Sequence, residues 1–388
     1  MSAQPFPPLP AGAVILQVLP ALNTGGVERG TLEMAAAIAK AGGVALVASA
    51  GGRLVAAVEA AGGHHITLPL TRKSPFAIWR NAALLAEIAT SERVALIHAR
   101  SRAPAWSAWL AGSRVASRFV TTYHGSYAEN FPAKRVYNSV MARGERVIAI
   151  SDFIAAQILD RYPIEPWRLR VIPRGVDPAL FDPAALASAE GLARQHQLAE
   201  AWALPAGRPV ILLPGRLSSW KGHAVAIAAL ARLPHPDPVL VFAGGDPRGR
   251  LARALRQEAR RLGIEPRVIF AGDCADMPAA YALADVVINA STRPEAFGRT
   301  VIEAQAMARP VIAADHGGAI ETIRPGETGW RVAPGDPAAL ADAIAAALAL
   351  GPEARAAHGA RARAAILERF TTAAMQTATL AVYAELLR

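Results

Sequence analysis

Short runs of β-branched and aliphatic residues alternate with longer, alanine-rich segments along most of the chain. Short apolar runs bounded by turn residues are typical of strands buried on both faces of a parallel sheet. In the first half, the predicted strands are Val14–Leu19, Val44–Ala48, Val94–His98, Arg118–Tyr123 and Val147–Ile150. In the second half, they are Val210–Leu213, Val239–Ala243, Val268–Ala271, Val286–Asn289 and Val311–Ala314. Because strands that alternate with helices pair in parallel, the pattern predicts an α/β protein.

The segments between these runs have the length and periodicity of helices. The predicted helices include Glu28–Lys40, Ile78–Thr90, His223–Leu233, Gly249–Leu262, Val301–Ala308 and Ala373–Leu387. Since the strand–helix rhythm occurs twice, we expect two Rossmann-like domains, at residues 1–183 and 205–370. The proline- and glycine-rich segment PRGVDPALFDP marks the junction, within residues 173–207. The last helix, within residues 373–388, is a candidate to pack back on the first domain.

The length of 388 residues agrees with two domains of roughly 100–200 residues each. Hydrophobic residues make up 53% and charged residues 19%, which excludes a disordered chain. The single cysteine, Cys274, cannot form an internal disulfide, so we expect a structural thiol in a reducing compartment. The first 20 residues lack the basic start of a signal peptide, and no apolar stretch is long enough to span a membrane. We therefore expect a cytoplasmic protein.

The formal net charge of +10 and the sequence pI of about 10.4 indicate anionic partners. Phosphorylated small molecules and an acidic membrane surface fit this charge. A nucleic-acid partner is not expected, because the chain has no zinc-ligand spacing, no aromatic-basic RNA-binding strand and no basic helical arm.

Ligands of open α/β sheets bind beyond the carboxyl ends of the strands, so glycines and polar residues directly after strands are the candidates for a site. The first such cluster is PALNTGGVERG, in which Gly25 and Gly26 lead into a predicted helix. Two glycines at a helix start let an anion or a sugar approach exposed backbone N–H groups. The alternative is an ordinary strand-to-helix turn.

The second cluster is PGRLSSWKGH, which contains Arg216 and Lys221. A guanidinium fork and an ammonium point charge complement each other on a diphosphate. The cluster is not a Walker loop, because Trp220 precedes Lys221 where that loop has glycine. The alternative is a pair of isolated surface charges.

The third cluster is NASTRPEAFGRTVIEAQAMARP, with Glu295 in a loop and Glu303 eight positions later in a predicted helix. Backbone N–H groups at that helix start, around Thr300, suit a phosphate. The two carboxylates suit sugar hydroxyls and a ribose diol. For Glu303 a second interpretation stays open, because Thr300-Val-Ile-Glu303 matches a helix capping box.

Taken in this order, the motifs resemble those of retaining glycosyltransferases of family 4, which have the two-domain GT-B fold. The resemblance covers nearly the whole chain. Its motifs are the early GG-V-E, YHG (Tyr123–Gly125), ISDF (Ile150–Phe153), VIPRGVD (Val171–Asp177), GRLSSWKG, PEAFGRTVIEA and HGGAIETIRPGETGWRV (His316–Val332). It implies an α/β, GT-B protein whose two Rossmann-like domains face each other across a cleft.

The resemblance also implies roles for the candidate residues. Arg216 and Lys221 would bind the donor diphosphate. Glu295, with the amides of Phe297 and Gly298, would hold the donor sugar, and Glu303 would bind the ribose. His124 would contact the sugar near its anomeric centre; for His124 alone, a structural histidine is the alternative. The remaining candidates are Gly26 at the diphosphate or the acceptor, Gly25 on the acceptor side, and Arg299 and Thr300 at the donor.

Two residues depart from the family pattern. Arg174 stands where the family often has asparagine, near the hinge, which puts domain closure in doubt. Arg299 adds a charge at a position that is often apolar, so it either touches an anionic ligand or faces solvent. No metal is expected, because the carboxylates form no D-x-D pair and two cations already offset the leaving diphosphate. No cofactor is expected beyond the nucleotide sugar, which is a substrate.

The expected function is therefore transfer of a sugar from a nucleotide sugar to a glycan or glycolipid acceptor. A sugar-nucleotide epimerase of the same fold and a non-catalytic nucleotide-sugar-binding subunit are the alternatives. Basic residues gather in the first half at Arg72–Lys73, Arg100–Arg102, Arg114–Arg118 and Lys134–Arg135. They favour peripheral attachment to an anionic inner membrane surface and an envelope glycolipid acceptor, such as lipopolysaccharide core.

Overall fold

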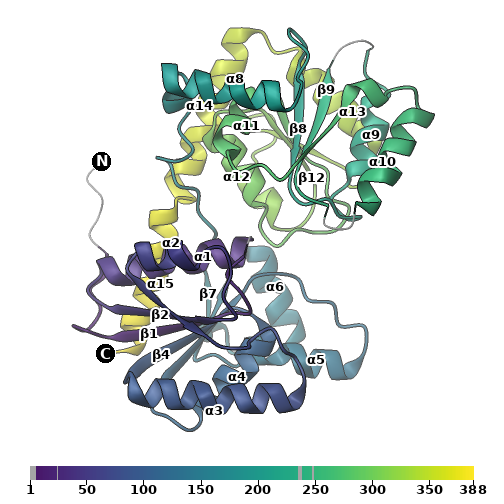
Figure 1. Ribbon diagram of the computed structural model, residues 1–388. Coiled ribbons are helices and arrows are strands. Elements are labelled where there is room, and N and C mark those ends of the chain that lie inside the picture. Colours follow the sequence, from purple (N-terminus) through teal and green to yellow (C-terminus); the bar gives the residue numbers. More distant parts are fainter. Residues whose placement is uncertain (1–5, 24, 235–237, 247–248) are drawn as a thin grey trace. The chain divides into compact units, whose positions relative to one another are not determined.

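The computed structural model describes residues 6–23, 25–234, 238–246 and 249–388, and these form two compact units (Figure 1). The first unit runs through Arg174 and takes in Thr372–Arg388; the second is Gly175–Thr371. The first five residues, part of the segment that argues against a signal peptide, lie outside the described ones.

Within the described residues, the first unit contains a seven-stranded parallel sheet in the order β3-β2-β1-β4-β5-β6-β7. The strands are β1 (Val14–Val18), β2 (Val44–Ser49), β3 (Gly63–Thr67), β4 (Val94–Ala99), β5 (Arg118–Tyr123), β6 (Arg146–Ala149) and β7 (Leu169–Val171). The helices are α1 (Gly26–Lys40), α2 (Val55–Ala60), α3 (Pro75–Ser91), α4 (Arg102–Gly112), α5 (Pro132–Asn138), α6 (Asp152–Arg161) and α15 (Thr372–Leu386). The strand order reverses between β1 and β4, which makes their carboxyl ends a switch point where α/β proteins bind ligands.

The described part of the second unit repeats the architecture with a six-stranded parallel sheet in the order β10-β9-β8-β11-β12-β13. The strands are β8 (Val210–Pro214), β9 (Val239–Ala243), β10 (Val268–Gly272), β11 (Val286–Asn289), β12 (Val311–Ala314) and β13 (Trp330–Val332). The helices are α7 (Pro183–Leu186), α8 (Ala189–Ala201), α9 (His223–Leu230), α10 (Arg250–Arg261), α11 (Met277–Leu283), α12 (Arg299–Ala306), α13 (Pro337–Leu348) and α14 (Pro352–Arg369). Here the strand order reverses between β8 and β11. Helices α9, α10 and α13 cover one face of this sheet, and α11, α12 and α14 cover the other (Figure 1).

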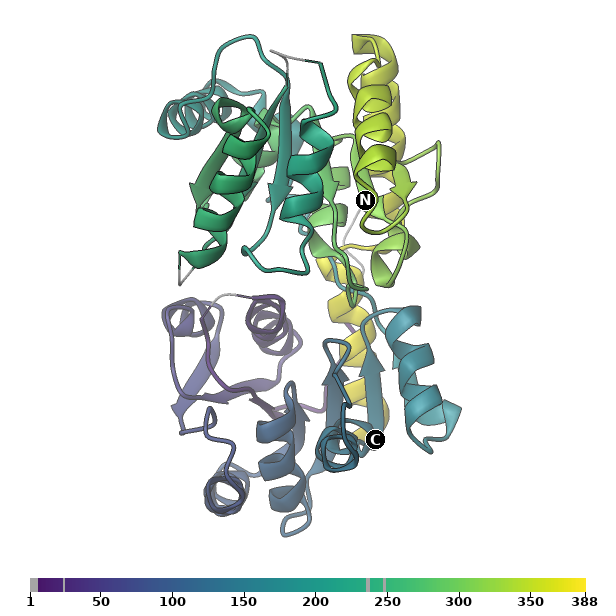
Figure 2. The ribbon, with the colours of Figure 1, turned by 90° about the vertical axis from the view of Figure 1, so that its right-hand side faces the viewer.

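The last helix, α15, lies against the first unit's sheet, where Figure 2 shows it ending beside the blue strands. Its apolar side chains, among them Leu380 and Val382, are buried in the core of that unit. Near its end, Glu385 pairs with Arg146, and with Arg170 at 3.1 Å. The chain therefore enters the first unit twice, and its last segment closes that unit's core.

The boundary between the units differs from the expected one. Residues 175–183, which the sequence assigns to the first domain, belong to the second unit. There Val176 donates a backbone hydrogen bond to Phe370 at 2.9 Å, and Phe181 packs against Tyr281. Burial of Val176 and Phe181 outweighs the breaking tendency of the surrounding prolines, so this proline-rich segment is packed structure rather than a free linker.

Three strands were absent from the expectation: β3, β7 and β13. Their sequences, GHHIT, LRV and WRV, are polar or only three residues long. β3, β7 and β13 lie at sheet edges, where one side of the strand is open and no continuous apolar run is needed.

Candidate active site

In the second unit, the loops after β8 and β11 come together at the switch point. Thr292 after β11 donates a backbone hydrogen bond to Trp220 after β8 at 2.7 Å. Gly222 makes this approach possible: its φ is +76°, and a Cβ there would lie 1.8 Å from the carbonyl oxygen of Ala290. Lys221 and Glu295, predicted to flank the donor, are thereby held on neighbouring loops.

Lys221 and Glu295 form an ion pair, with 2.7 Å between Nζ and Oε1, and both side chains are largely buried. Ser291 donates a second hydrogen bond to the same carboxylate oxygen at 2.6 Å. Burial raises the pKa of the Glu295 carboxyl, but the charge of Lys221 and hydrogen bonds from Lys221, Ser291 and Asn289 outweigh burial and leave the pKa lowered. Glu295 is therefore an acceptor of hydrogen bonds at neutral pH.

Arg216, in contrast, is exposed, and no hydrogen bond or ion pair joins its side chain to a described residue. Arg216 lies in the loop directly after β8, and β8 is the neighbour of β11 in the sheet. An exposed arginine at the carboxyl edge of the sheet is available to an anionic ligand.

Glu303 lies in the second turn of α12 and is 7% exposed. The hydroxyl of Tyr281 donates to its Oε2 at 2.9 Å, and Arg299 lies 3.6 Å from its Oε1. The capping-box interpretation is wrong, because the N-cap of α12 is Gly298, in the left-handed conformation, and Thr300 already lies inside the helix. The solvent-facing alternative for Arg299 is also wrong, since its side chain is only 17% exposed and faces Glu303.

The start of α12 presents backbone rather than side chains. The Phe297 ring is 3% exposed and packs toward Phe370, so only its amide is available to a ligand. The Thr300 hydroxyl accepts a hydrogen bond from Asn289 at 3.5 Å. The loop before the helix is fixed from behind, because Gly318 donates to the carbonyl of Glu295 at 2.8 Å. A rigid loop leading into a helix N-terminus is suited to bind phosphate.

In the first unit, Gly25 is the N-cap of α1 and Gly26 is its first residue, directly beyond β1. No side chain caps this helix start. His124 follows β5. Between His124 and Gly26 lies Arg174, whose guanidinium donates to the Gly26 carbonyl at 3.1 Å and to His124 Nδ1 at 3.0 Å. The departure from asparagine at position 174 is thus a contact inside the candidate site.

Sequence reasoning missed Tyr281 and Ser291 as members of the site. Tyr281 lies in an alanine-rich helix with no motif around it, and its link to Glu303 depends on the packing of α11 near α12. Ser291 belongs to the third cluster, but a serine in a loop gives no signal of its partner. The sequence did mark Arg174 as unusual, because an arginine stands there where the family often has asparagine, but it did not reveal the contacts of Arg174 with Gly26 and His124.

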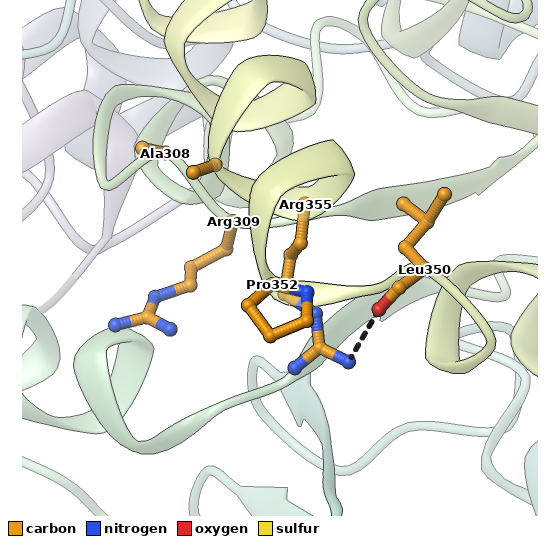
Figure 3. A pocket seen from close by; sticks show the side chains of 6 residues that line it. Ala308, Arg309, Leu350, Pro352 and Arg355 are labelled. Atoms are coloured by element: carbon orange, nitrogen blue, oxygen red, sulfur yellow. Dashed lines mark hydrogen bonds between the residues drawn. The ribbon is translucent and has the colours of Figure 1, made fainter.

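One surface cavity, of about 360 Å³, lies elsewhere in the second unit (Figure 3). Arg309 and Arg355 line it, and Arg355 is paired with Asp285 at 2.7 Å. Arg309 and Asp285 precede β12 and β11, so the cavity lies at the amino ends of the strands, away from the candidate site. The described residues contain no cluster of three or more His, Cys, Asp or Glu that could hold a metal ion.

Two buried histidines, His98 and His223, and the partly buried His124 make stability depend on pH. Burial is the main cause that lowers the pKa of His98 and His124 well below the ordinary value, and that lowers the pKa of His223 to about 4. The unfolded chain protonates them near pH 6.5, so the folded state loses stability as pH falls through that value. For His223 we expect a loss of about 2 kcal/mol between pH 7.5 and pH 5, and the protonation of His98 and His124 in the unfolded chain should add to it. Urea unfolding at both pH values measures this loss; equal free energies of unfolding would contradict three histidines that stay neutral in the folded state.

Proteins of known structure resemble this chain over nearly its whole length. The family profile described as Glycosyl transferases group 1 matches residues 195–365, and the profile described as Glycosyltransferase Family 4 matches residues 24–180. A solved glycosyltransferase from Rickettsia africae is 37% identical, with 97% of this chain and 99% of that chain covered and a TM-score of 0.89. Anabaena HepE, solved in complex with UDP, is 25% identical, with 96% and 100% covered and a TM-score of 0.81.

Curated proteins match a smaller part of this chain than the two solved structures do. The D-inositol 3-phosphate glycosyltransferase of Acidothermus cellulolyticus is 34% identical over 265 residues, which cover 61% of this chain and 57% of that protein. The protein of the same name from Salinispora arenicola is 36% identical over 213 residues, which cover 51% of this chain and 46% of that protein. The chain thus spans about half the length of the curated relatives it matches.

Proposed function

Because this chain belongs to glycosyltransferase family 4 and has the GT-B fold, we propose that it transfers a sugar from a nucleoside-diphosphate sugar to an acceptor hydroxyl with retention of anomeric configuration. One observation carries the proposal. The loops after the adjacent strands β8 and β11 hold Arg216, the Lys221–Glu295 pair and the start of α12 at one sheet edge. This edge combines cations for a diphosphate with carboxylates for hydroxyl groups.

In the proposed complex, Arg216 and Lys221 bind the diphosphate, and the N–H groups at the start of α12 add positive potential. The Glu295 carboxylate accepts hydrogen bonds from the sugar hydroxyls, and the backbone amides of Phe297 and Gly298 donate hydrogen bonds to the sugar oxygens. Glu303 accepts from the ribose diol. Uridine diphosphate is the first nucleotide to test, because Anabaena HepE was solved with it.

The proposed reaction takes place on one face of the sugar. The acceptor oxygen forms a bond to the anomeric carbon, the bond from that carbon to the phosphate oxygen breaks, and the departing phosphate oxygen takes the acceptor's proton. Interactions that strengthen as the diphosphate gains charge accelerate this step, which gives Arg216 and Lys221 their role. Retention rests on membership of the family and is read by NMR of the product's anomeric proton.

A donor panel tests the proposal and separates it from its rivals. We expect one nucleotide sugar, present at about 100 times its dissociation constant, to stabilise the fold by about 2.7 kcal/mol. Incubation with that donor then distinguishes the functions. Transfer releases a nucleoside diphosphate; an epimerase returns an altered nucleotide sugar; a binding subunit returns the donor unchanged. Stabilisation by no nucleotide sugar would contradict all three.

For the acceptor, we propose an envelope glycolipid approached at an anionic membrane surface. The described residues contain no helix whose length and apolar character suit a membrane crossing, so attachment would be peripheral. The prediction of a basic face was wrong in including Arg100, because this residue is 1% exposed and lies inside the fold. The second candidate acceptor is a phosphorylated polyol, which the name of the curated relatives favours.

The start of α3 supports membrane attachment better than the scattered arginines do. The α3 surface, as we name it, comprises exposed Arg72, Lys73, Phe76, Trp79 and Arg80. Phe76 is 72% exposed and Trp79 is 57% exposed. Aromatic side chains beside basic ones are the combination that inserts at an anionic interface.

We expect the protein to sediment with anionic liposomes at low salt and to dissociate at high salt, since each nearby Lys or Arg contributes about 1 kcal/mol. Trp79→Ser should weaken this binding about tenfold, because it removes an inserted ring. Leu192→Ser is the matched control, since Leu192 is equally exposed but lies in the second unit. Absence of binding at low salt, or binding indifferent to salt, favours the soluble phosphorylated acceptor.

A further inference from the structure

We propose that Arg174 is a positioning residue that fixes His124 as the neutral tautomer with its proton on Nε2, so that His124 donates a hydrogen bond to an oxygen of the bound sugar and does not act as a base. This inference deepens the proposed function and rests on it for the identity of the ligand. The tautomer itself rests on the protein alone.

The chemistry of the contact determines which nitrogen carries the proton. An arginine side chain only donates hydrogen bonds, and its guanidinium nitrogen lies 3.0 Å from His124 Nδ1. A protonated Nδ1 would place two donors against each other. Nδ1 must therefore accept, and the one remaining proton of a neutral imidazole lies on Nε2.

Arg174 is held firmly enough to impose this choice. Its side chain is buried, with the residue 5% exposed, and the guanidinium also donates to the Gly26 carbonyl at 3.1 Å and to the Met375 sulfur at 3.3 Å. Helix α1 leaves room for it only because position 30 is glycine. A Cβ on Gly30 would lie 2.3 Å from the guanidinium nitrogen.

The surrounding charges keep the ring neutral. The groups that act on His124 are Arg174 from beyond β7, Arg100 from beyond β4 and His98 within β4. Burial lowers the pKa of His124 most, and Arg174, Arg100 and His98 lower it further. Arg100 is itself buried and donates to Gln17 at 2.8 Å, so it stays beside the site.

The other nitrogen is where a ligand would act. Nε2 of His124 is buried and has no hydrogen-bond partner among the described residues. A buried donor without an acceptor is unfavourable by about 1–3 kcal/mol, and a ligand oxygen that accepts from it removes that penalty. His124 follows β5 beside the Gly26 end of α1, at the ligand-binding edge of the first unit.

The test is long-range proton–nitrogen NMR of the histidine rings, with the His124 signals assigned by their loss in His124→Gln. In the wild type, we expect a proton on Nε2 alone, unchanged from pH 5 to pH 8. Arg174→Met, which removes the donors, should lose this fixed pattern, and Arg174→Lys, which keeps one, should restore it. Gly30→Ala should act like Arg174→Met by displacing the guanidinium, without removing its charge. Lys40→Met, an exposed charge on α1, should change nothing.

Kinetics provide the second readout. We expect kcat/KM to fall about tenfold in Arg174→Met and Gly30→Ala and to recover in Arg174→Lys, as loss of one hydrogen bond to the ligand predicts. A wild-type proton on Nδ1, a ring that titrates between pH 5 and pH 8, or an unchanged tautomer in both Arg174→Met and Gly30→Ala would overturn the inference. The NMR result is independent of transfer, so an absence of sugar transfer would contradict the proposed function and leave the tautomer assignment standing.

Discussion

Replacing Arg216 with alanine is expected to lower kcat on the order of 10²-fold and to leave the melting temperature unchanged. The guanidinium is exposed and joined to no described residue, so its removal leaves no packing defect. Its proposed partner is the diphosphate, whose charge grows as it departs. Removal of one such preorganised donor typically raises the barrier by about 3 kcal/mol.

Lys221→Ala should lose activity to a similar extent, but unlike Arg216→Ala it should also destabilise the fold. Its ammonium group is the partner of the largely buried Glu295 carboxylate at 2.7 Å. Removal of one partner leaves the other charge uncompensated, and we expect a loss of stability on the order of 3 kcal/mol. The double variant Lys221→Met/Glu295→Gln removes both charges; it should recover most of the stability and none of the activity.

Turnover with a saturating donor and urea unfolding measure the two effects for Arg216 and Lys221. Arg293→Ala is the control, because Arg293 is an exposed arginine in the β11–α12 loop to which no role is assigned. Wild-type turnover in both the Arg216 and the Lys221 variants would refute the diphosphate assignment. An unchanged free energy of unfolding in Lys221→Ala would show that the Lys221–Glu295 ion pair does not stabilise the fold.

The second large effect is expected at Glu303. Glu303→Gln should weaken donor binding about 10- to 100-fold, because a hydrogen bond to a charged acceptor contributes about 1.5–3 kcal/mol. The fold should stay close to wild type, since the glutamine oxygen still accepts from the Tyr281 hydroxyl. Calorimetric titration with the donor and with the free nucleotide measures the loss.

Tyr281→Phe is the matched control for Glu303. It removes the hydroxyl that holds Oε2 and leaves the carboxylate in place. If Glu303 binds the ribose, the tyrosine variant loses stability more than affinity, and the glutamine variant loses affinity more than stability. A Glu303→Gln variant that binds the donor normally but unfolds more easily would assign Glu303 a structural role.

Much of the fold was predictable because buried parallel strands need continuous apolar runs. Val239–Ala243 and Val286–Asn289, for example, form strands within the predicted bounds. The edge strands β3, β7 and β13 were not; GHHIT at Gly63–Thr67, for example, has two histidines and no apolar run. The first domain was predicted to end at residue 183 rather than 174, because proline-rich composition suggests a linker, whereas Phe181 is 1% exposed and anchors the segment in the second unit.

Of the candidate site residues, only those of the second unit were brought together by sequence reasoning. Motif spacing brought Lys221 and Glu295 together correctly, because both follow strands that are neighbours in the sheet. It could not reveal that Lys221 pairs with Glu295, nor that Gly298 rather than Thr300 begins α12. The contact between Arg174 and His124 joins residues 50 positions apart and depends on the order of β5, β6 and β7. No local pattern encodes such a pairing.

Mass spectrometry of one reaction tests sugar transfer most directly. The protein is incubated with UDP-glucose and the rest of the donor panel, together with an envelope lipid extract or an inositol phosphate. Free nucleoside diphosphate and glycosylated acceptor are then measured over time. Our expectation is that both form in equal amounts, and that neither forms with an Arg216→Ala/Glu303→Gln variant of unchanged stability. An epimerised nucleotide sugar, or a donor that binds and returns unchanged with both acceptor classes, would contradict it.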